Sequence, residues 1–229
     1  MAAAREGAKG VGEQHVQAAY SKALVGVPSE RRMSEAELAL AASHEAGHAV
    51  VNEAVRAALG FAGNGTSGFR TVAHLSIVPT GACGGVTQFA EPDEAERLPR
   101  SRRVLLAQLA VLMGGRAAEE LRIGKGEATM GASNDIEQAT QLATQMVAVG
   151  GLSARIGPRS LKAGIAPSEE LRRHADQQVS ELLRAALETA RNALQDNLSL
   201  HHAVFTALLE QETLDGQSFN ELLKEHGVV

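Results

Sequence analysis

The chain of 229 residues contains no tryptophan, one tyrosine and only 3% aromatic residues in all. So few aromatic side chains cannot build a platform on which nucleic-acid bases stack. The net charge is -5, from 22 basic and 27 acidic residues, and the basic residues form no continuous run. Nucleic-acid binding depends on an excess of positive charge on one face. We therefore expect no nucleic-acid partner.

Disulfides and membrane spans are also lacking. Cys83 is the single cysteine, so no disulfide can form within the chain. The longest apolar stretch, Val104 to Met113, includes Gln108 and is about half the length needed to cross a bilayer. The N-terminus has no apolar signal-peptide core. With 44% hydrophobic residues, the composition predicts a soluble, helix-rich domain.

Alanine and leucine dominate both ends of the chain, whereas glycine and proline gather between residues 60 and 100. This distribution predicts a mainly α protein with a short β-hairpin in its middle. Ser34 and Glu37 have the spacing of a capping box, which predicts a helix from there to Gly60. The other expected elements are strands at 71–78 and 85–89, helices at 101–122 and 135–149, the latter capped by Ser133, and two or three helices within 168–223.

The pattern with the clearest chemistry is His44-Glu45-Ala46-Gly47-His48, inside the first of these helices. Residues four apart lie on one helix face, so both imidazoles can bind one metal ion. Glu45 lies on the flank, where its carboxylate can reach a metal-bound water. Zinc lowers the pKa of such a water from about 15.7 to about 7, and a carboxylate can then accept its proton. The spacing is that of zinc proteases, H-E-x-x-H.

A plain helix can also carry two solvated histidines, which is the alternative reading. Three features favour a metal site: the clean cap before the helix, the apolar residues on both sides of the motif, and Gly47, which we expect to leave room beside the metal.

A catalytic zinc site needs a third protein ligand. A third histidine six residues after His48 is excluded, because position 54 is an alanine. Glu119, Glu120 and Asp135 are the candidates. Asp135 lies at an expected helix start, where the helix dipole favours a carboxylate. Glu119 and Glu120 are adjacent, so one could face the site while the other is solvated. Residue types and spacing alone leave Asp135 and Glu119 open.

The chain resembles the peptidase domain of the FtsH-type ATP-dependent zinc metalloproteases. The segments that carry this resemblance are 33–51 (MSEAELALAASHEAGHAVV), 76–87 (SIVPTGACGGVT), 114–121 (GGRAAEEL), 129–146 (TMGASNDIEQATQLATQM) and 209–216 (LEQETLDG). They occur in the family's order and span about residues 20 to 225.

The resemblance implies a helical metallopeptidase fold with a small β-hairpin beside the zinc-binding helix. It implies one Zn²⁺ per chain, held by His44, His48 and Asp135, with Glu45 as the catalytic base and Glu119 as an acid that supports a ligand. Gly85, Val86 and Thr87 lie on the hairpin strand along which an extended substrate could pair; a plain structural hairpin is the alternative. Residues 1–30 resemble the end of an ATPase lid, which leaves 31–229 as the metallopeptidase domain.

The resemblance also implies partners. The family cleaves unfolded or membrane-extracted polypeptides inside a hexameric ring driven by an ATPase. No G-x-x-x-x-G-K-[ST] phosphate loop occurs in this sequence, so ATP would act only through an ATPase domain of a parent or partner chain. Full-length relatives are bound to a bacterial inner membrane, a plastid or a mitochondrion. A non-catalytic ring subunit is the alternative function, although such a subunit would have no need of Glu45.

Overall fold

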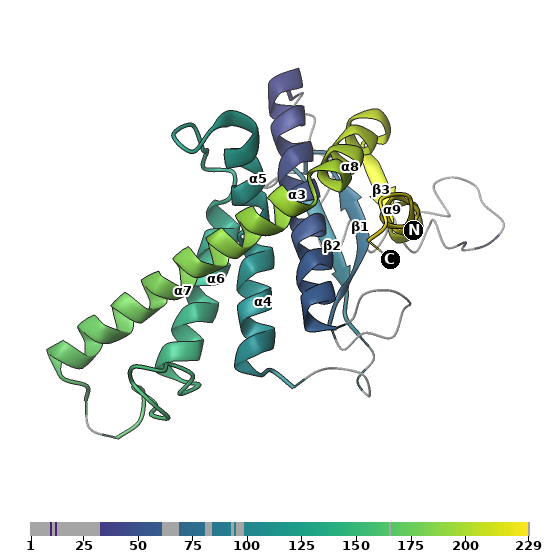
Figure 1. The fold of residues 1–229 in the computed structure, drawn as a ribbon. Coiled ribbons are helices and arrows are strands. Elements are labelled where there is room, and N and C mark those ends of the chain that lie inside the picture. The colour runs from purple at the N-terminus through teal and green to yellow at the C-terminus, as the bar shows by residue number, and fades with distance from the viewer. Residues whose placement is uncertain are drawn as a thin grey trace.

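The structure is a computed structural model. It describes residues 33–60, 69–80, 84–92, 94, 99–164 and 166–228, together with Gly10 and Gly12. The expectations for residues 1–30, for Cys83 and for most of the loop after Gly60 therefore fall outside the described residues. The described elements are α3 (Glu35–Leu59), β1 (Thr71–Ser76), β2 (Val86–Ala90), α4 (Arg102–Leu112), α5 (Gly114–Ile123), α6 (Ser133–Ala148), α7 (Glu169–Asp196), α8 (Leu198–Gln211), β3 (Thr213–Asp215) and α9 (Gly216–Glu225) (Figure 1).

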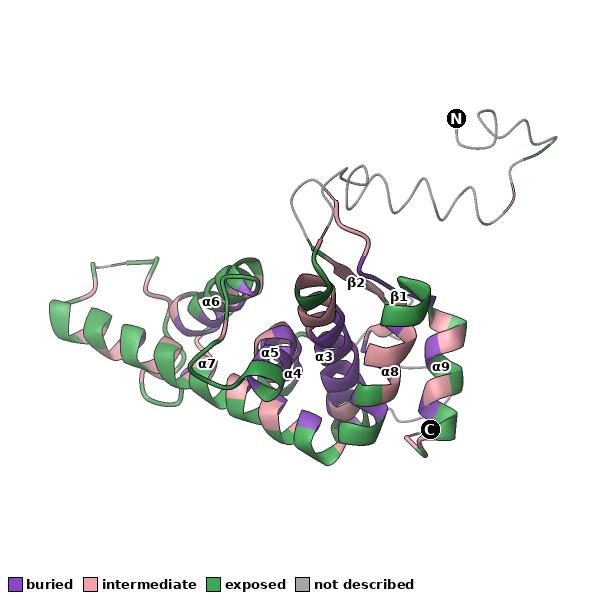
Figure 2. Cartoon of the chain, turned by 90° about the horizontal axis from the view of Figure 1, so that it is seen from above, coloured by how far each residue is buried: buried purple, intermediate pink, exposed green. Residues whose placement is uncertain are grey.

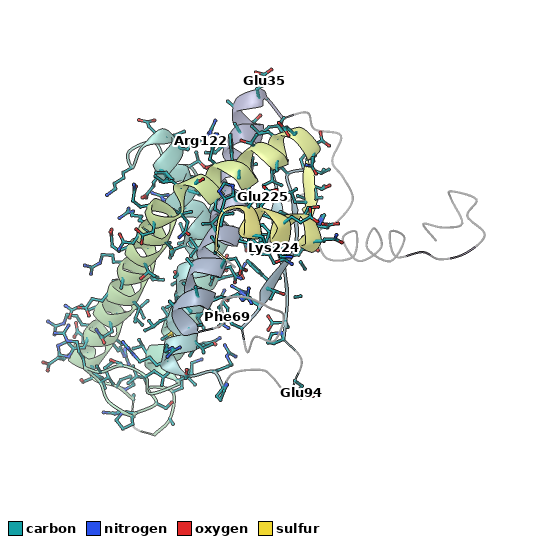
Figure 3. All side chains as sticks on the ribbon, turned by 45° about the vertical axis from the view of Figure 1, so that its right-hand side comes forward. Glu35, Phe69, Glu94, Arg122, Lys224 and Glu225 are labelled. Atoms are coloured by element: carbon teal, nitrogen blue, oxygen red, sulfur yellow. The ribbon has the colours of Figure 1, made fainter. Side chains whose placement is uncertain are left out.

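Helix α3 is the centre of the fold. Its first turn has the expected capping box, in which Ser34 accepts a hydrogen bond from Glu37 N and the Glu37 carboxylate accepts one from Ser34 N. It ends at Gly60, whose φ of 88° is in the left-handed region that glycine adopts readily. Seen from above, α3 lies between α4 and α5 on one side and α8 and the sheet on the other (Figure 2). Figure 3 labels Glu35 at the first turn and Phe69 near the opposite end of this helix.

The prediction of a single helix over residues 101–122 is wrong. The chain instead forms α4 and α5, with a break at Met113. The break sets α5 closely against α3, because a Cβ on Gly47 would lie 2.5 Å from both Gly114 O and Ala118 Cβ. Gly47 therefore serves the packing of two helices, whereas the sequence suggested room beside a metal. Gly114 and Gly47 thus let the backbones of α5 and α3 approach closely.

The sheet has three antiparallel strands in the order β2-β1-β3. The hairpin of β1 and β2 is confirmed, and Leu75 pairs with Thr87 across it. Strand β3 has only three residues and was not expected; it pairs with β1 on the side away from β2. Strand β2 therefore lies at an edge of the sheet as the structure describes it.

The C-terminal third forms the three helices α7, α8 and α9, within the two or three expected, with breaks near Asn197 and at residues 213–215. Helix α7 crosses α4, α5 and α6, and its N-terminal half extends beyond them with mostly exposed residues (Figures 1 and 2). The predicted cap at Ser133 is wrong: α6 begins at Ser133 itself, whose hydroxyl donates to Met130 O. Among the described helices, none combines the length and the apolar character needed to cross a membrane.

Candidate metal centre

Three side chains from two distant segments meet at the middle of α3. The Nε2 atoms of His44 and His48 lie 3.0 Å apart, as expected for residues on consecutive turns of one face. Asp135, in the first turn of α6, places Oδ2 3.1 Å from His44 Nε2 and 3.3 Å from His48 Nε2. These three atoms form the one group of metal-binding geometry among the described residues.

The spacing of these atoms fits a zinc ion. Zinc binds nitrogen and oxygen ligands at about 2.0–2.2 Å in a tetrahedron, whose edges are then about 3.3–3.5 Å. The three observed separations are 3.0, 3.1 and 3.3 Å. Two histidines and one carboxylate are also a donor set that suits zinc. The residues present therefore fit the metal, with the fourth position left for a water or a substrate.

The other nitrogen of each imidazole is held by the protein. His48 Nδ1 donates to Val111 O at 2.8 Å, and His44 Nδ1 donates to Glu119 Oε1 at 2.9 Å. Both bonds place a proton on Nδ1, which directs the Nε2 lone pair of each ring to the shared point. Glu119 is 1% exposed and also accepts hydrogen bonds from the backbone N and the hydroxyl of Thr129. Glu119 thus contacts the ligand His44, not the metal position.

The electrostatics of the centre favour a positive charge. Burial alone would lower the pKa of His44, but hydrogen bonds to Asp135 and Glu119 outweigh it and raise this pKa to about 10. For Asp135, burial opposes the charged form, and the hydrogen bonds to His44 and His48 still lower its pKa. In the metal-free chain this charge is a proton on His44, and a divalent cation can replace it.

Glu45 lies beside the three ligands and is only 6% exposed. The hydroxyl of Thr87 lies 2.7 Å from Glu45 Oε2 and 3.1 Å from the backbone oxygen of the same residue. Sequence reasoning placed Thr87 on the substrate strand and missed this contact, since the two residues are 42 positions apart. A threonine on a strand after two glycines gives no sequence signal of a carboxylate partner.

The chain also matches a known protein family. The model of peptidase family M41 matches residues 31–222. The chain belongs to peptidase family M41. The match covers α3, α5 and the start of α6, the elements that carry the three ligand atoms, Glu45 and Glu119.

Relatives of this M41 domain are named as zinc metalloproteases. The chain is 38% identical over 225 residues to ATP-dependent zinc metalloprotease FTSH 11, chloroplastic/mitochondrial, of Arabidopsis thaliana, covering 96% of the chain and 26% of that protein. It is 40% identical over 188 residues to FTSH 9, chloroplastic/mitochondrial, of Oryza sativa subsp. japonica (82% and 22%). It is 33% identical over 237 residues to FtsH of Chloroflexus aggregans (97% and 34%). The chain thus spans about a quarter to a third of the length of these relatives.

The centre of the M41 domain opens into a cavity of about 560 Å³. His44, His48, Asp135 and Glu45 line it, as do Gly85, Val86 and Thr87 of the expected substrate strand. Met130 also lines it and is 83% exposed, the largest fraction among the exposed apolar side chains of the described residues. Sequence reasoning missed Met130, although it is the one large apolar residue in the polar run before Asp135.

Glu120 lies on the side of α5 that faces α7. Its carboxylate forms ion pairs with Arg116 at 2.9 Å and with Arg191 of α7 at 2.6 Å, and the residue is 7% exposed. Of the two adjacent glutamates, Glu119 is the one that contacts His44. The expectation that the other is solvated is wrong, because Glu120 joins α5 to α7.

Proposed function

We propose that this M41 domain is a zinc-dependent metalloendopeptidase in which His44, His48 and Asp135 bind one Zn²⁺ and Glu45 is the general base. The observation that carries the proposal is the convergence of the three ligand atoms, within 3.3 Å of one another, beside a carboxylate that lines the same cavity.

The chemistry divides between the metal and the chain. Zn²⁺ supplies a Lewis acid that lowers the pKa of a water and polarises the scissile carbonyl. Glu45 accepts the proton of the attacking water and then delivers it to the leaving amine nitrogen. Glu119 and Val111 O hold the imidazoles in the orientation that keeps both Nε2 atoms on the metal.

The substrate class follows from the shape of the site. The cavity lies between α3 and the edge strand β2, whose residues Val86 and Thr87 line it together with Gly85. An extended polypeptide can pair with such an edge through backbone hydrogen bonds, which are independent of side-chain sequence. A folded protein cannot lay its backbone there, so we propose unfolded or membrane-extracted polypeptides as substrates.

An ATPase domain that delivers the substrate is part of the same proposal. The relatives are named ATP-dependent, whereas this sequence has no phosphate-loop motif. We propose that an ATPase domain of the parent or a partner chain delivers the substrate, and that the domains assemble as a homo- or hetero-hexameric ring held at a membrane by other parts of the full-length protein. Residues 1–30 would connect the domain to that ATPase.

The test is cleavage of a fluorescently labelled unfolded protein by the zinc-loaded chain, without ATP, beside Glu45→Gln. We expect the variant to bind zinc at one equivalent and to lose cleavage by at least about 1,000-fold, because it keeps the ligands but cannot accept a proton. Asp135→Ala should lose the zinc as well. Cleavage by Glu45→Gln at the wild-type rate would contradict the proposal. Stoichiometric zinc without cleavage by the wild-type chain would mean that the site is built but needs the ring or the ATPase to become productive.

A further inference from the structure

The carboxylate of Glu45 has a single hydrogen-bond donor within the described part of the chain, the hydroxyl of Thr87. At 2.7 Å from Oε2, this contact has the length of a hydrogen bond between a hydroxyl and a charged carboxylate. A hydroxyl has one proton, so the shorter contact with the carboxylate takes precedence over the 3.1 Å contact with Glu45 O. One oxygen of the carboxylate is therefore occupied and Oε1 remains available.

The available oxygen lies close to Gly85, where an added side chain would crowd it. A Cβ on Gly85 would lie 2.7 Å from Glu45 Oε1 and 3.0 Å from Ser76 O. Gly85 directly precedes β2 and Thr87 is the second residue of this strand. Residues two apart in extended backbone lie on one side of it. The same side of the strand thus binds Oε2 and leaves space beside Oε1.

We propose that Thr87 is a positioning residue for the general base. Its hydroxyl fixes the carboxylate of Glu45 through Oε2, so that Oε1 is presented to a water in the cavity. Strand β2 then orients the base as well as offering an edge to the substrate. The inference rests on the proposed function, because Glu45 needs a fixed orientation only if it accepts a proton.

An alternative role for Thr87 is contact with the substrate, which the sequence suggested. The two roles differ in what a loss of the hydroxyl changes. A positioning role predicts a lower kcat with little change in KM, since the orientation of a proton acceptor matters in the transition state. A substrate contact predicts a higher KM with little change in kcat.

The test measures binding of a peptide hydroxamate to the zinc-loaded chain by calorimetry, which does not depend on turnover. A hydroxamate ligates zinc as an anion, and its proton passes to the carboxylate beside the metal. We expect binding to weaken about 100-fold in Glu45→Gln and about 10-fold in Thr87→Val, since a hydrogen bond to a charged group is lost in the latter. Thr87→Ser keeps the hydroxyl and should bind within about twofold of the wild type.

Thr71→Val is the matched control. Thr71 lies in the same sheet, at the far end of the hairpin from Ser76, and pairs with Ala90. The same isosteric change there should leave hydroxamate binding unaltered, and all variants should bind one equivalent of zinc. Where turnover is measured, Thr87→Val should lower kcat about 10- to 100-fold at constant KM.

The outcomes test the positioning role of Thr87 separately from the proposed function. Weak binding by Thr87→Val, restored by Thr87→Ser, supports the positioning role. Wild-type binding by Thr87→Val, with weak binding by Glu45→Gln, overturns the inference and leaves the proposed function standing. A chain that binds no zinc, or binds hydroxamate equally well as Glu45→Gln, overturns the proposed function and the inference with it.

Discussion

The two faces of α5 each carry a buried glutamate, but the two glutamates have different roles. The face toward α3 has Gly114 and Gly115 packed on the backbone of α3 and on the His44 ring, and it carries Glu119 into the metal centre. The face toward α7 carries Glu120, which binds two arginines. A carboxylate on the first face orients a ligand, whereas its neighbour on the second face joins two helices. The comparison teaches that adjacent acids on one helix differ in role because of what packs against each face.

The largest effect is expected from Gly115→Ala. The added Cβ would lie 2.3 Å from Cε1 and Nε2 of the His44 ring, a separation at which the ring must move. Because the ring lies between Glu119 and the metal position, we expect zinc affinity to fall more than about 100-fold. A chelator competition assay measures this loss.

Gly126→Ala is the control for that substitution, because a Cβ there meets nothing within 4 Å. It should keep wild-type zinc affinity. If Gly115→Ala binds zinc as tightly as this control, the tight packing of α5 on His44 is not required for the metal centre.

A smaller effect separates the two glutamates. Glu119→Gln replaces the carboxylate that accepts the His44 Nδ1 proton, so we expect zinc affinity to fall about 10- to 100-fold. Glu120→Gln should leave zinc affinity within about twofold and lower the free energy of unfolding by about 1–2 kcal/mol, since it weakens charged hydrogen bonds to Arg116 and Arg191. Metal titration and urea denaturation of both variants test the contrast. Equal loss of zinc affinity in the two variants would contradict the different roles of Glu119 and Glu120.

The contribution of Glu120, on the face of α5 toward α7, to the free energy of unfolding should depend on pH. Burial raises the pKa of Glu120, but the hydrogen bonds and charges of Arg116 and Arg191 outweigh it and lower this pKa below its ordinary value of 4.5. The contribution of Glu120 to the free energy of unfolding is therefore complete above about pH 4.5 and is lost as the pH falls through the lower folded value. Denaturation from pH 7 to pH 3 should show the wild type and Glu120→Gln converging in acid. A constant difference between them would show that ionisation of Glu120 contributes nothing.

The smallest effect lies far from both faces, on the projecting half of α7. Arg155 and Glu181 form an ion pair at 3.2 Å with side chains 54% and 45% exposed. Exposed pairs of this kind contribute little because water and salt screen them. Arg155→Ala should change the free energy of unfolding by less than about 0.5 kcal/mol and leave zinc affinity unaltered. A larger loss would show that this half of α7 is held more rigidly than its exposure indicates.

Local features of the site were predictable from the sequence. The i,i+4 spacing of His44 and His48 and the capping box at Ser34 depend on neighbouring residues along one helix, and helix geometry alone sets where they point. Asp135 needed the family resemblance, because it is 91 residues from His44 and spacing left Glu119 as a rival ligand. The contact of Thr87 with Glu45 could not be foreseen, since it depends on how β2 packs on α3.

The errors in the predicted fold also arise from packing between segments that are distant in the sequence. The break at Met113 lies where an apolar run meets Gly114 and Gly115, a pair that weakens a helix, and the packing of Gly114 on α3 fixes the break at this point. Strand β3 has three residues, too few to show an alternating pattern, and exists because β1 offers it an edge. Glu120 looks solvated in the sequence because its partner Arg191 is 71 positions away.

The position of β3 fixes an order of events during synthesis of the chain. Residues 213–215 leave the ribosome after α3, the hairpin and the start of α6. Until they do, the edge of β1 that pairs with β3 has no partner strand. Since β1 is the neighbour of β2, the strand that holds Glu45 gains its full support only when the domain is nearly complete. A nascent chain therefore contains His44, His48 and Asp135 well before the sheet beside them is complete.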